Sequence, residues 1–154
     1  MISELVDELN AKHVEHTVVE HPRTQTARAE AQAVGVTPHK VAKTVVVVTD
    51  DGYVRAVLAA SDRLDLRKLH GIIGAKTVPR LATEAELGAA YPAFELGAVP
   101  PIGGPAGDRV IVDARLARED EVVFEAGTHS QSIKLRMRDV IRLAGAQVAD
   151  ISAA

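Results

Sequence analysis

The chain has 154 residues, of which 47% are hydrophobic and 25% charged, so we expect residues 1–154 to fold as one globular domain. Cysteine is absent, which excludes disulfides, thiolate metal sites and a cysteine nucleophile. A net charge of −3 and only 3% aromatic residues argue against a general nucleic-acid coat and against a site built on repeated base stacking. A local basic patch remains compatible with this composition.

The N-terminal segment is acidic and amphipathic, unlike a secretory signal. The apolar run from Val45 to Val48 is far shorter than a membrane span. Together these observations predict a soluble, cytoplasmic protein with no membrane partner.

Hydrophobic spacing and capping residues predict alternating helices and strands in the first part of the chain. Ile2, Leu5 and Leu9 recur at helical spacing, and Thr26 and Gly35 are suited to begin and end a second helix. In chain order we expect a helix over residues 1–12, a strand over 14–20, a helix between 24 and 35, and a single helical turn that starts at Thr37-Pro38 and leads to Lys43.

The next segment predicts a β-hairpin. Thr44 to Thr49 is a continuous β-branched run, Asp50-Asp51-Gly52 supplies a turn, and Tyr53 to Ala59 returns as a second strand. Continuous apolarity indicates a strand that is covered on both faces. Because a hairpin pairs its strands antiparallel, we expect a mixed α/β domain rather than a doubly wound parallel sheet.

Capping patterns and composition predict the elements that follow. Ser61-Asp62 is expected to cap a helix that carries Leu66 and Leu69, and Thr83 with Glu86 forms a capping-box pattern for a short helix ending near Gly88. The remaining expected elements are an ordered Gly- and Pro-rich loop over residues 91–108, strands over 110–112, 122–125 and 132–135, and a closing helix over 137–143.

Three features are candidates for chemistry. Lys43 lies where the helical turn meets the buried strand, which places a cationic head at a sheet edge. The segment from Gly97 to Gly103 combines rigid prolines with glycines, and such a loop can present backbone N–H groups to a carbonyl or an oxyanion. Gly127-Thr128-His129 follows the strand expected at 121–126. Each feature alone also suits a structural role: a solvated lysine, a stiff loop and a turn.

Other familiar site patterns are missing from the sequence. The histidines form no HExxH pair and no closed ligand set with carboxylates, so we expect no metal site. No serine lies in a G-x-S-x-G elbow. The glycine-rich segment from Gly103 to Gly107 lacks the Lys-Ser/Thr pair of a phosphate-binding loop.

In combination and in this order, the three features resemble the YbaK/prolyl-tRNA-synthetase-associated editing domain family. The resemblance rests on the lysine entering the strand Lys43–Val47, on the G-x-x-x-P-x-G loop with Gly97, Pro101 and Gly103, and on the glycine corner before the last strand and helix. Residues 59–69 and 80–87 look like the family's strand-to-helix segment and the element after it. The resemblance therefore spans about residues 10–150.

The resemblance implies a free-standing aminoacyl-tRNA deacylase. Such an enzyme hydrolyses the ester that joins a wrong amino acid to the terminal adenosine of a tRNA, often a tRNA for proline. The implied fold is a compact α/β domain with a mixed, barrel-like sheet surrounded by helices. The implied partner is the acceptor end of an aminoacyl-tRNA, with an aminoacyl-tRNA synthetase as a further candidate and with no DNA and no cofactor.

The resemblance also implies residue roles. Lys43 matches the lysine that contacts the 3′-terminal nucleotide, and Gly97 matches the glycine whose backbone N–H polarises the scissile carbonyl. His129 matches a histidine of some branches, which would position water or act as a base near neutral pH. The residues implied in substrate binding are Thr44, Ala98, Pro101, Gly103, Gly127 and Thr128.

Two departures from the family leave the amino acid specificity open. The stretch Gly127-Thr128-His129-Ser130 differs from the Gly-x-Arg-Gly of the branch that hydrolyses cysteinyl-tRNA for proline, and Thr44 stands where an alanine-editing branch usually has asparagine. They also motivate an alternative, a non-catalytic module of the same fold that binds a tRNA end, a nucleotide or a synthetase. A structural or protein-interaction domain is a third hypothesis.

The implied chemistry suits this composition. An aminoacyl ester is already activated, so positioning and oxyanion stabilisation are the main requirements, and water or a group of the substrate can attack. Recognition of an acceptor end needs only a few basic contacts. The candidate basic residues, which also suit a solvated surface, are Lys40, Lys43, Arg63, Arg67, Lys68, Lys134, Arg136, Arg138 and Arg142.

Overall fold

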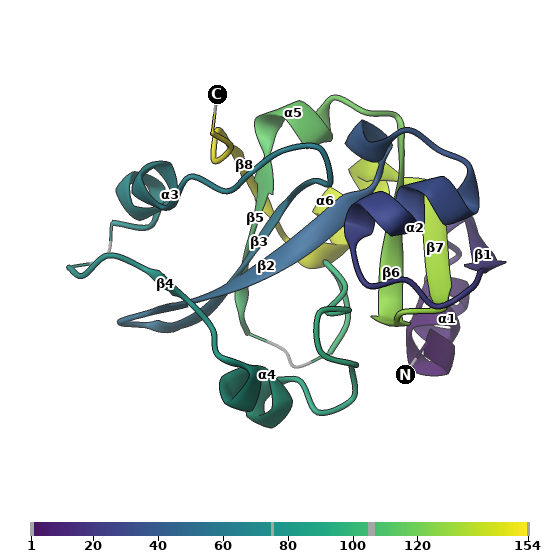
Figure 1. Cartoon of the computed structure of the whole chain (residues 1–154), viewed down its shortest axis with the longest axis horizontal. Coiled ribbons are helices and arrows are strands. Elements are labelled where there is room, and N and C mark those ends of the chain that lie inside the picture. Colours follow the sequence, from purple (N-terminus) through teal and green to yellow (C-terminus); the bar gives the residue numbers. More distant parts are fainter. Residues whose placement is uncertain (1, 75, 105–106, 154) are drawn as a thin grey trace.

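The computed structural model describes residues 2–74, 76–104 and 107–153, and Figure 1 shows how their elements are arranged. None of the described helices is both long and apolar enough to cross a membrane. In chain order the elements are α1 (Ile2–Ala11), β1 (His16–Glu20), α2 (Ala27–Val34), the 3₁₀ turn η1 (Pro38–Lys40), β2 (Ala42–Thr49), β3 (Gly52–Ala59), α3 (Leu66–Ile73), β4 (Arg80–Leu81), α4 (Glu84–Ala90), β5 (Arg109–Asp113), α5 (Ala114–Ala117), β6 (Glu121–Thr128), β7 (Gln131–Arg136), α6 (Met137–Ala144) and β8 (Gln147–Ala149).

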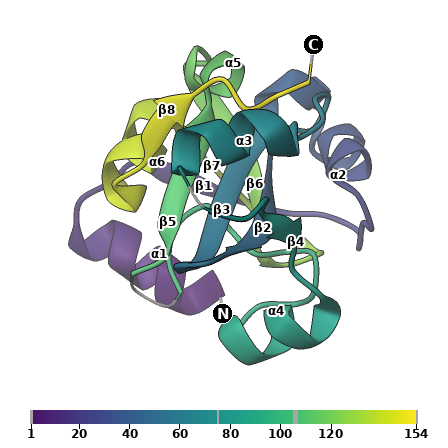
Figure 2. The same ribbon diagram turned by 90° about the vertical axis from the view of Figure 1, so that its left-hand side faces the viewer.

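The strands form two sheets that lie next to each other (Figures 1 and 2). The smaller sheet has the order β1-β7-β6 and is antiparallel. The larger has the order β4-β2-β3-β5-β8, with antiparallel pairing of β2 to β3 and β4 and parallel pairing of β5 to β3 and β8. The expected mixed α/β class is therefore confirmed. Within the described residues only an isolated bridge between Val41 and Val123 joins the sheets, so they do not close into the expected barrel-like form.

Local sequence signals explain the hairpin that builds the larger sheet. The hairpin forms where it was predicted, but the register pairs Thr49 with Gly52, so the turn has two residues and β3 begins one residue before the expected Tyr53. Gly52 has a φ of +118°, which disfavours residues with a side chain. β3 is buried from Val54 to Ala59, so it is covered on both faces, whereas β2 is only partly buried. The continuous apolar pattern thus describes β3 better than β2.

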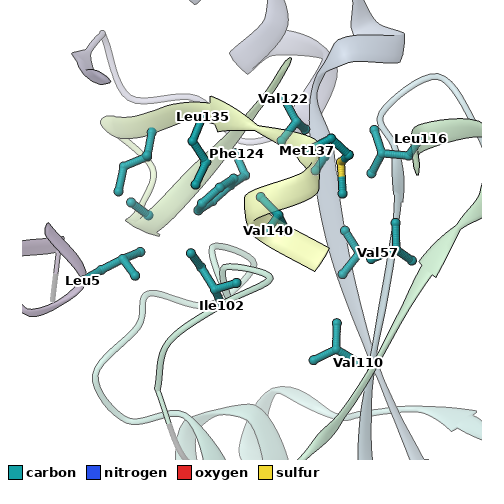
Figure 3. Close-up of a cluster of buried hydrophobic side chains, with 14 of the residues drawn as sticks. Leu5, Val57, Ile102, Val110, Leu116, Val122, Phe124, Leu135, Met137 and Val140 are labelled. Carbon is teal, nitrogen blue, oxygen red and sulfur yellow. The ribbon is translucent and has the colours of Figure 1, made fainter. Parts of the chain in front are cut away.

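The main hydrophobic core lies between the two sheets and the helices α1 and α6 (Figure 3). Phe124 of β6 and Leu135 of β7 face Val57 and Val110 of the larger sheet across this core. α6 contributes Met137 and Val140, and α1 contributes Leu5. Burial of a side chain of this size stabilises the fold by about 1.5–3 kcal/mol. The core holds β2 and β6, the two strands that carry the site, in a fixed relation.

Several helix ends follow their predicted caps. Thr26 caps α2 by accepting a hydrogen bond from the Ala29 amide, and Gly35 ends this helix in the left-handed conformation. Thr83 and Glu86 form the predicted capping box of α4, but that helix continues to Ala90, beyond the expected end near Gly88.

One predicted cap is wrong. α3 begins at Leu66, and its cap is Asp65, which accepts hydrogen bonds from the amides of Arg67 and Lys68. The predicted cap, Ser61-Asp62, instead lies in the turn after β3, where the Asp62 amide bonds to the Ala59 carbonyl. Asp62 and Asp65 are both suitable helix caps in the sequence. Asp62 does not cap the helix because it belongs to the turn that follows β3.

The loop from Tyr91 to Asp108 has no helix or strand in its described part, as predicted, and a buried arginine fixes it. Arg55 is 1% exposed and donates from Nε to Asp108 (2.6 Å), from Nη1 to the Pro100 carbonyl (2.8 Å) and from Nη2 to the Gly103 carbonyl (2.7 Å). The Tyr91 hydroxyl also bonds to Asp108, and the guanidinium lies 5.1 Å from the centre of the Tyr91 ring. These contacts attach both ends of the loop to β3.

Candidate functional site

A small cavity of about 100 Å³ lies where α2, β2, β6 and the loop after α4 meet. β2 supplies Lys43 and Thr44, and the loop supplies Gly97 and Ala98. The other lining residues are Gln25, Ala27, Glu30, Ala42, Val99, Phe124 and Glu125. Figure 1 shows α2 beside β6, close to the start of β2. The fold therefore gathers four of the singled-out residues, from two distant segments, in one place.

Lys43 forms the cationic end of this cavity. η1 ends at Lys40 and leads the chain into β2, and the half-buried Lys43 Nζ donates a hydrogen bond to the Asp62 carbonyl. Burial lowers the pKa of Lys43 below its ordinary value; Asp62 opposes this lowering, and Arg28 and Arg63 add to it. A partly buried ammonium beside two further cations gains from an anionic partner. This end therefore suits a phosphate or a developing oxyanion.

Thr44 adds an unused polar group. Its hydroxyl oxygen is buried and has no hydrogen-bond partner among the described residues. A buried polar group without a partner is unfavourable by about 1–3 kcal/mol. Thr44 lines the cavity next to Lys43, and a bound ligand that reaches this hydroxyl would supply the missing partner.

Gly97 presents its backbone to the cavity in a fixed orientation. Its φ of +82° lies in the left-handed region that favours glycine. In the described part of the chain its N–H donates no hydrogen bond, although both neighbours are held: the Leu96 carbonyl accepts from His129 Nε2, and the Ala98 amide donates to the Glu95 carbonyl. The Ala98 carbonyl also accepts from the Gly127 amide (3.1 Å). A free N–H on a rigid loop is what an oxyanion donor requires.

His129 lies directly behind Gly97 and outside the cavity lining. It is 5% exposed, and a Cβ placed on Gly97 would lie 3.4 Å from its Cε1. Its Nε2 donates to the Leu96 carbonyl (2.6 Å), because a carbonyl only accepts, and its Nδ1 bonds to Glu125 Oε2 (2.9 Å). Both ring nitrogens are thus engaged, and the imidazole links the loop to β6.

The other predicted binding residues lie in different places. Gly127 packs against the loop that carries Gly97, since a Cβ placed on Gly127 would lie 2.7 Å from Phe94 Cδ1. The Thr128 hydroxyl is buried without a partner among the described residues, outside the cavity lining. Pro101 and Gly103 line a separate hollow beside Arg55. The structure therefore brings Lys43, Thr44, Gly97 and Ala98 together, with His129 and Gly127 supporting them.

Sequence reasoning missed two carboxyl groups in the cavity. Glu30 of α2 is 1% exposed, and burial raises its pKa to about 8, with a smaller contribution from Glu125. Glu125 of β6 is 9% exposed, and burial, followed by Glu95, raises its pKa to about 8. The available signal was an acidic residue inside the otherwise apolar strand Val122–Ala126. No group of three or more His, Asp or Glu residues in the described ranges is placed to hold a metal ion.

Four of the nine candidate basic residues are paired on the surface. Lys68 contacts Asp150, Lys134 approaches Glu121, Arg136 approaches Glu15 and Arg142 pairs with Asp139. Arg63 and Arg67 differ, since both are exposed and line a hollow that also includes Asp62, whose carbonyl holds Lys43. A basic surface therefore adjoins the cationic end of the cavity.

Comparison with known proteins shows to which family the chain belongs. The family model of the aminoacyl-tRNA editing domain matches residues 21–143. A crystal structure of a candidate trans-editing enzyme for prolyl tRNA synthetase is 30% identical, with a TM-score of 0.87, and the match covers 99% of this chain and 97% of that one. A search of curated proteins gave no match.

Two further solved structures share the fold. One, from computational epitope grafting on scaffold proteins, is 27% identical with a TM-score of 0.87, and the match covers 99% of this chain and 95% of that one. The other, the hypothetical protein APE2540, is 23% identical with a TM-score of 0.88, and covers 97% and 99% of the two chains. The arrangement of the two sheets is thus shared by the structures that match over nearly their whole length.

Proposed function

Because the chain belongs to the aminoacyl-tRNA editing domain family, we propose that it is a deacylase that hydrolyses the ester of a mischarged tRNA in trans. The observation that supports this most directly is the cavity in which a cationic lysine, Lys43, and an unused backbone N–H, that of Gly97, lie together. An aminoacyl ester at the 3′ end of a tRNA has a phosphate close to a scissile carbonyl. The cavity offers a partner for each.

In this proposal the Gly97 N–H donates to the scissile carbonyl oxygen and to the oxyanion that replaces it in the tetrahedral intermediate. One such donor is worth about 10²–10³-fold in rate. The Gly97 peptide must be rigid, because the donor must not reorganise during the reaction. The hydrogen bonds of the neighbouring Leu96 and Ala98 hold this peptide in place. Water attacks the carbonyl carbon, the ester C–O bond breaks, and the ribose hydroxyl of the tRNA leaves with a proton, which gives the free amino acid and the tRNA.

Lys43 binds the terminal nucleotide in this proposal. Its ammonium, with Arg28 and Arg63 nearby, neutralises a phosphate and fixes the register of the ester against Gly97. The unpartnered Thr44 hydroxyl donates to a polar atom of the ribose or the ester. Both interactions orient the substrate and do not themselves transfer a proton.

His129 acts as a positioning residue in this proposal. Its Nε2–H holds the Leu96 carbonyl, and this contact fixes the peptide that carries the Gly97 N–H. Loss of the imidazole should therefore reduce kcat more than it raises KM, since the donor to the transition state is displaced while Lys43 still binds the nucleotide.

We further propose a short amino acid as the edited residue and tRNA for proline as its carrier. The cavity volume of about 100 Å³ admits a small side chain and excludes an aromatic one. The relation to prolyl-tRNA editing is supported by the structure that is 30% identical over nearly the whole chain, a candidate trans-editing enzyme for prolyl tRNA synthetase.

A deacylation panel tests the function. Purified protein is incubated with tRNAs charged with each amino acid, on the tRNA for proline and on the cognate tRNAs, and loss of the ester is followed against buffer alone. The proposal predicts accelerated hydrolysis of a small set of short amino acids. Binding of tRNA without hydrolysis across the whole panel would instead support the alternative, a non-catalytic module of the same fold, which the departures at Thr44 and Gly127–Ser130 motivate.

A further inference from the structure

The cavity lining also contains two carboxyl groups. Glu30 approaches it from α2 and Glu125 from β6, and both carboxyl groups are almost fully buried. Lys43 does not neutralise them, since the charged groups that act on it are Asp62, Arg28 and Arg63. The charged groups that act on Glu125 are Glu95 and Arg23. Glu125 and His129 are the charged groups that act on Glu30, so Lys43, although it lines the same cavity, acts on neither carboxyl group.

Each carboxyl group has only one oxygen engaged. Oε2 of Glu30 accepts from the Ser132 hydroxyl, and Oε2 of Glu125 bonds to His129 Nδ1. Among the described residues no hydrogen bond involves Oε1 of either side chain. Oε1 of each glutamate is therefore an unused acceptor, and the buried Thr44 hydroxyl of the same cavity lining has no partner either. Acceptor oxygens of a cavity lining that have no partner are available to the N–H donors of a ligand.

A histidine belongs to the hydrogen-bond network of each carboxyl group. His21 Nδ1 lies 2.8 Å from the Pro22 carbonyl, to which it must donate, and His21 Nε2 lies 2.8 Å from Ser132 Oγ. When Glu30 is protonated, it donates to Ser132 Oγ and the Ser132 hydroxyl donates to His21 Nε2. When Glu30 is ionised, the Ser132 hydroxyl donates to Glu30 Oε2 instead, and the proton that Glu30 loses leaves for the solvent.

The second carboxyl group has the same arrangement without the serine. His129 Nε2–H donates to the Leu96 carbonyl, so Nδ1 accepts a proton from a neutral Glu125 or donates one to an ionised Glu125. Both pairs can therefore hold their carboxyl groups neutral in the empty cavity. When a cation binds, a carboxyl group can lose its proton to the solvent and face the cation as a carboxylate.

We propose that Glu30 and Glu125 form a subsite for the α-ammonium group of the esterified amino acid. The proposal rests on the proposed deacylase function, because it assigns the parts of one substrate to different residues of one cavity. The nucleotide phosphate meets Lys43, the carbonyl meets the Gly97 N–H, and the ammonium meets the carboxyl pair. The subsite makes a free amino group a condition of binding, so peptidyl or N-acylated esters are rejected.

The raised pKa of both glutamates fits this role. Burial holds each near 8, so at pH 7 the empty site is largely neutral, and an adjacent ammonium lowers a carboxyl pKa. Binding of the cation therefore displaces protons from the carboxyl groups, on the order of one at pH 7. Ser132 is a positioning residue, because its hydroxyl holds Glu30 Oε2 and also contacts His21 Nε2.

The test uses stable amide analogues of an aminoacylated 3′ end, 3′-alanylamino-3′-deoxyadenosine and its N-acetyl form. Calorimetry in phosphate and in Tris at pH 7 gives the affinity and the number of protons released. We expect the intact protein to bind the free-amine form at least 10-fold more tightly and to release protons. In Glu30→Gln and Glu125→Gln the preference should fall below 3-fold, while Glu84→Gln, an exposed glutamate of α4, should behave like the unaltered protein.

Equal affinity of the unaltered protein for the two analogues would overturn the subsite, and this comparison needs no variant to fold. An equal loss of affinity for both analogues in the two glutamine variants would also overturn it. The proposed function fails separately. Amine-selective binding with no ester hydrolysis in the panel would sustain the subsite and refute the deacylase, whereas hydrolysis without amine selectivity would do the reverse.

Discussion

The contacts of Arg55 predict a large loss of stability when its side chain is replaced. Its guanidinium is buried and donates to the Asp108 carboxylate and to the Pro100 and Gly103 carbonyls. Arg55→Met keeps much of the apolar stem but leaves Asp108, whose side chain is only 14% exposed, without its cation. Breaking a buried ion pair in this way destabilises a protein by about 3–5 kcal/mol.

The chain offers two matched comparisons for this prediction. Arg55→Lys keeps a cation for Asp108, but its single ammonium cannot reach both carbonyls, so we expect a loss of about 2–4 kcal/mol from hydrogen bonds to a charged group. Arg109→Met removes an exposed arginine at the start of β5. Its side chain hydrogen-bonds only to Gln147 among the described residues, so this variant should change the free energy of unfolding by less than about 0.5 kcal/mol.

Urea unfolding followed by far-UV circular dichroism measures these changes. The expected order of the free energy of unfolding is Arg109→Met, then Arg55→Lys, then Arg55→Met, from most to least stable. Because Arg55 holds the loop that carries Gly97, the two Arg55 variants should also lose deacylase activity while they remain folded. An Arg55→Met variant within 1 kcal/mol of the unaltered protein would refute the role that the contacts give to this arginine.

Three further predictions follow from the same contacts. Gly97→Ala should lower the free energy of unfolding by about 1–2 kcal/mol, measured in urea, because its φ is +82°, and should lower kcat more than it raises KM in deacylation assays. Gly127→Ala should cost at least as much, since its Cβ would lie 2.7 Å from the Phe94 ring; a melting temperature equal to that of the unaltered protein would contradict the close packing. Because burial raises the pKa of Glu30 and Glu125 from 4.5 to about 8, the folded chain binds more protons than the unfolded one between these values. The stability that these groups contribute is therefore full below pH 4.5 and is lost as the pH rises through about 8. In unfolding curves taken from pH 5 to 8, the Glu30→Gln/Glu125→Gln double variant should show a smaller fall of the free energy of unfolding with pH than the unaltered protein.

Much of the fold could be predicted from sequence because its signals are local. The hairpin at Gly52, the caps at Thr26 and Thr83 and the closing helix each depend on residues within a few positions. The elements that were missed, β4, α5 and β8, have two to four residues and little apolar periodicity. Such short elements are defined by neighbours elsewhere in the chain. The cap of α3 was wrongly predicted for a similar reason, since Asp62 and Asp65 carry the same local signal and contacts elsewhere in the chain decide between them.

The site divides in the same way. Lys43, Gly97 and the glycine corner were found because they form a recognisable order along the chain. Glu30 was not found, because its burial depends on the packing of α2 against β6. From sequence alone, a glutamate in an alanine-rich helix is expected to be exposed to solvent. Pro101 and Gly103 lie in the same loop as Gly97, but the loop turns at Arg55 and takes them to a different hollow.

The central claim is that the cavity at Lys43 and Gly97 is where the ester is held and hydrolysed. The most direct measurement is the kcat/KM of deacylation for Lys43→Ala, on the best substrate of the panel. The control is Lys40→Ala, which removes an exposed lysine of η1 three residues away. With both variants folded, the account predicts a loss of about 100-fold or more for Lys43→Ala, in keeping with the loss of one well-placed charged group, and less than threefold for Lys40→Ala. Equal activity of Lys43→Ala and the unaltered protein would contradict it.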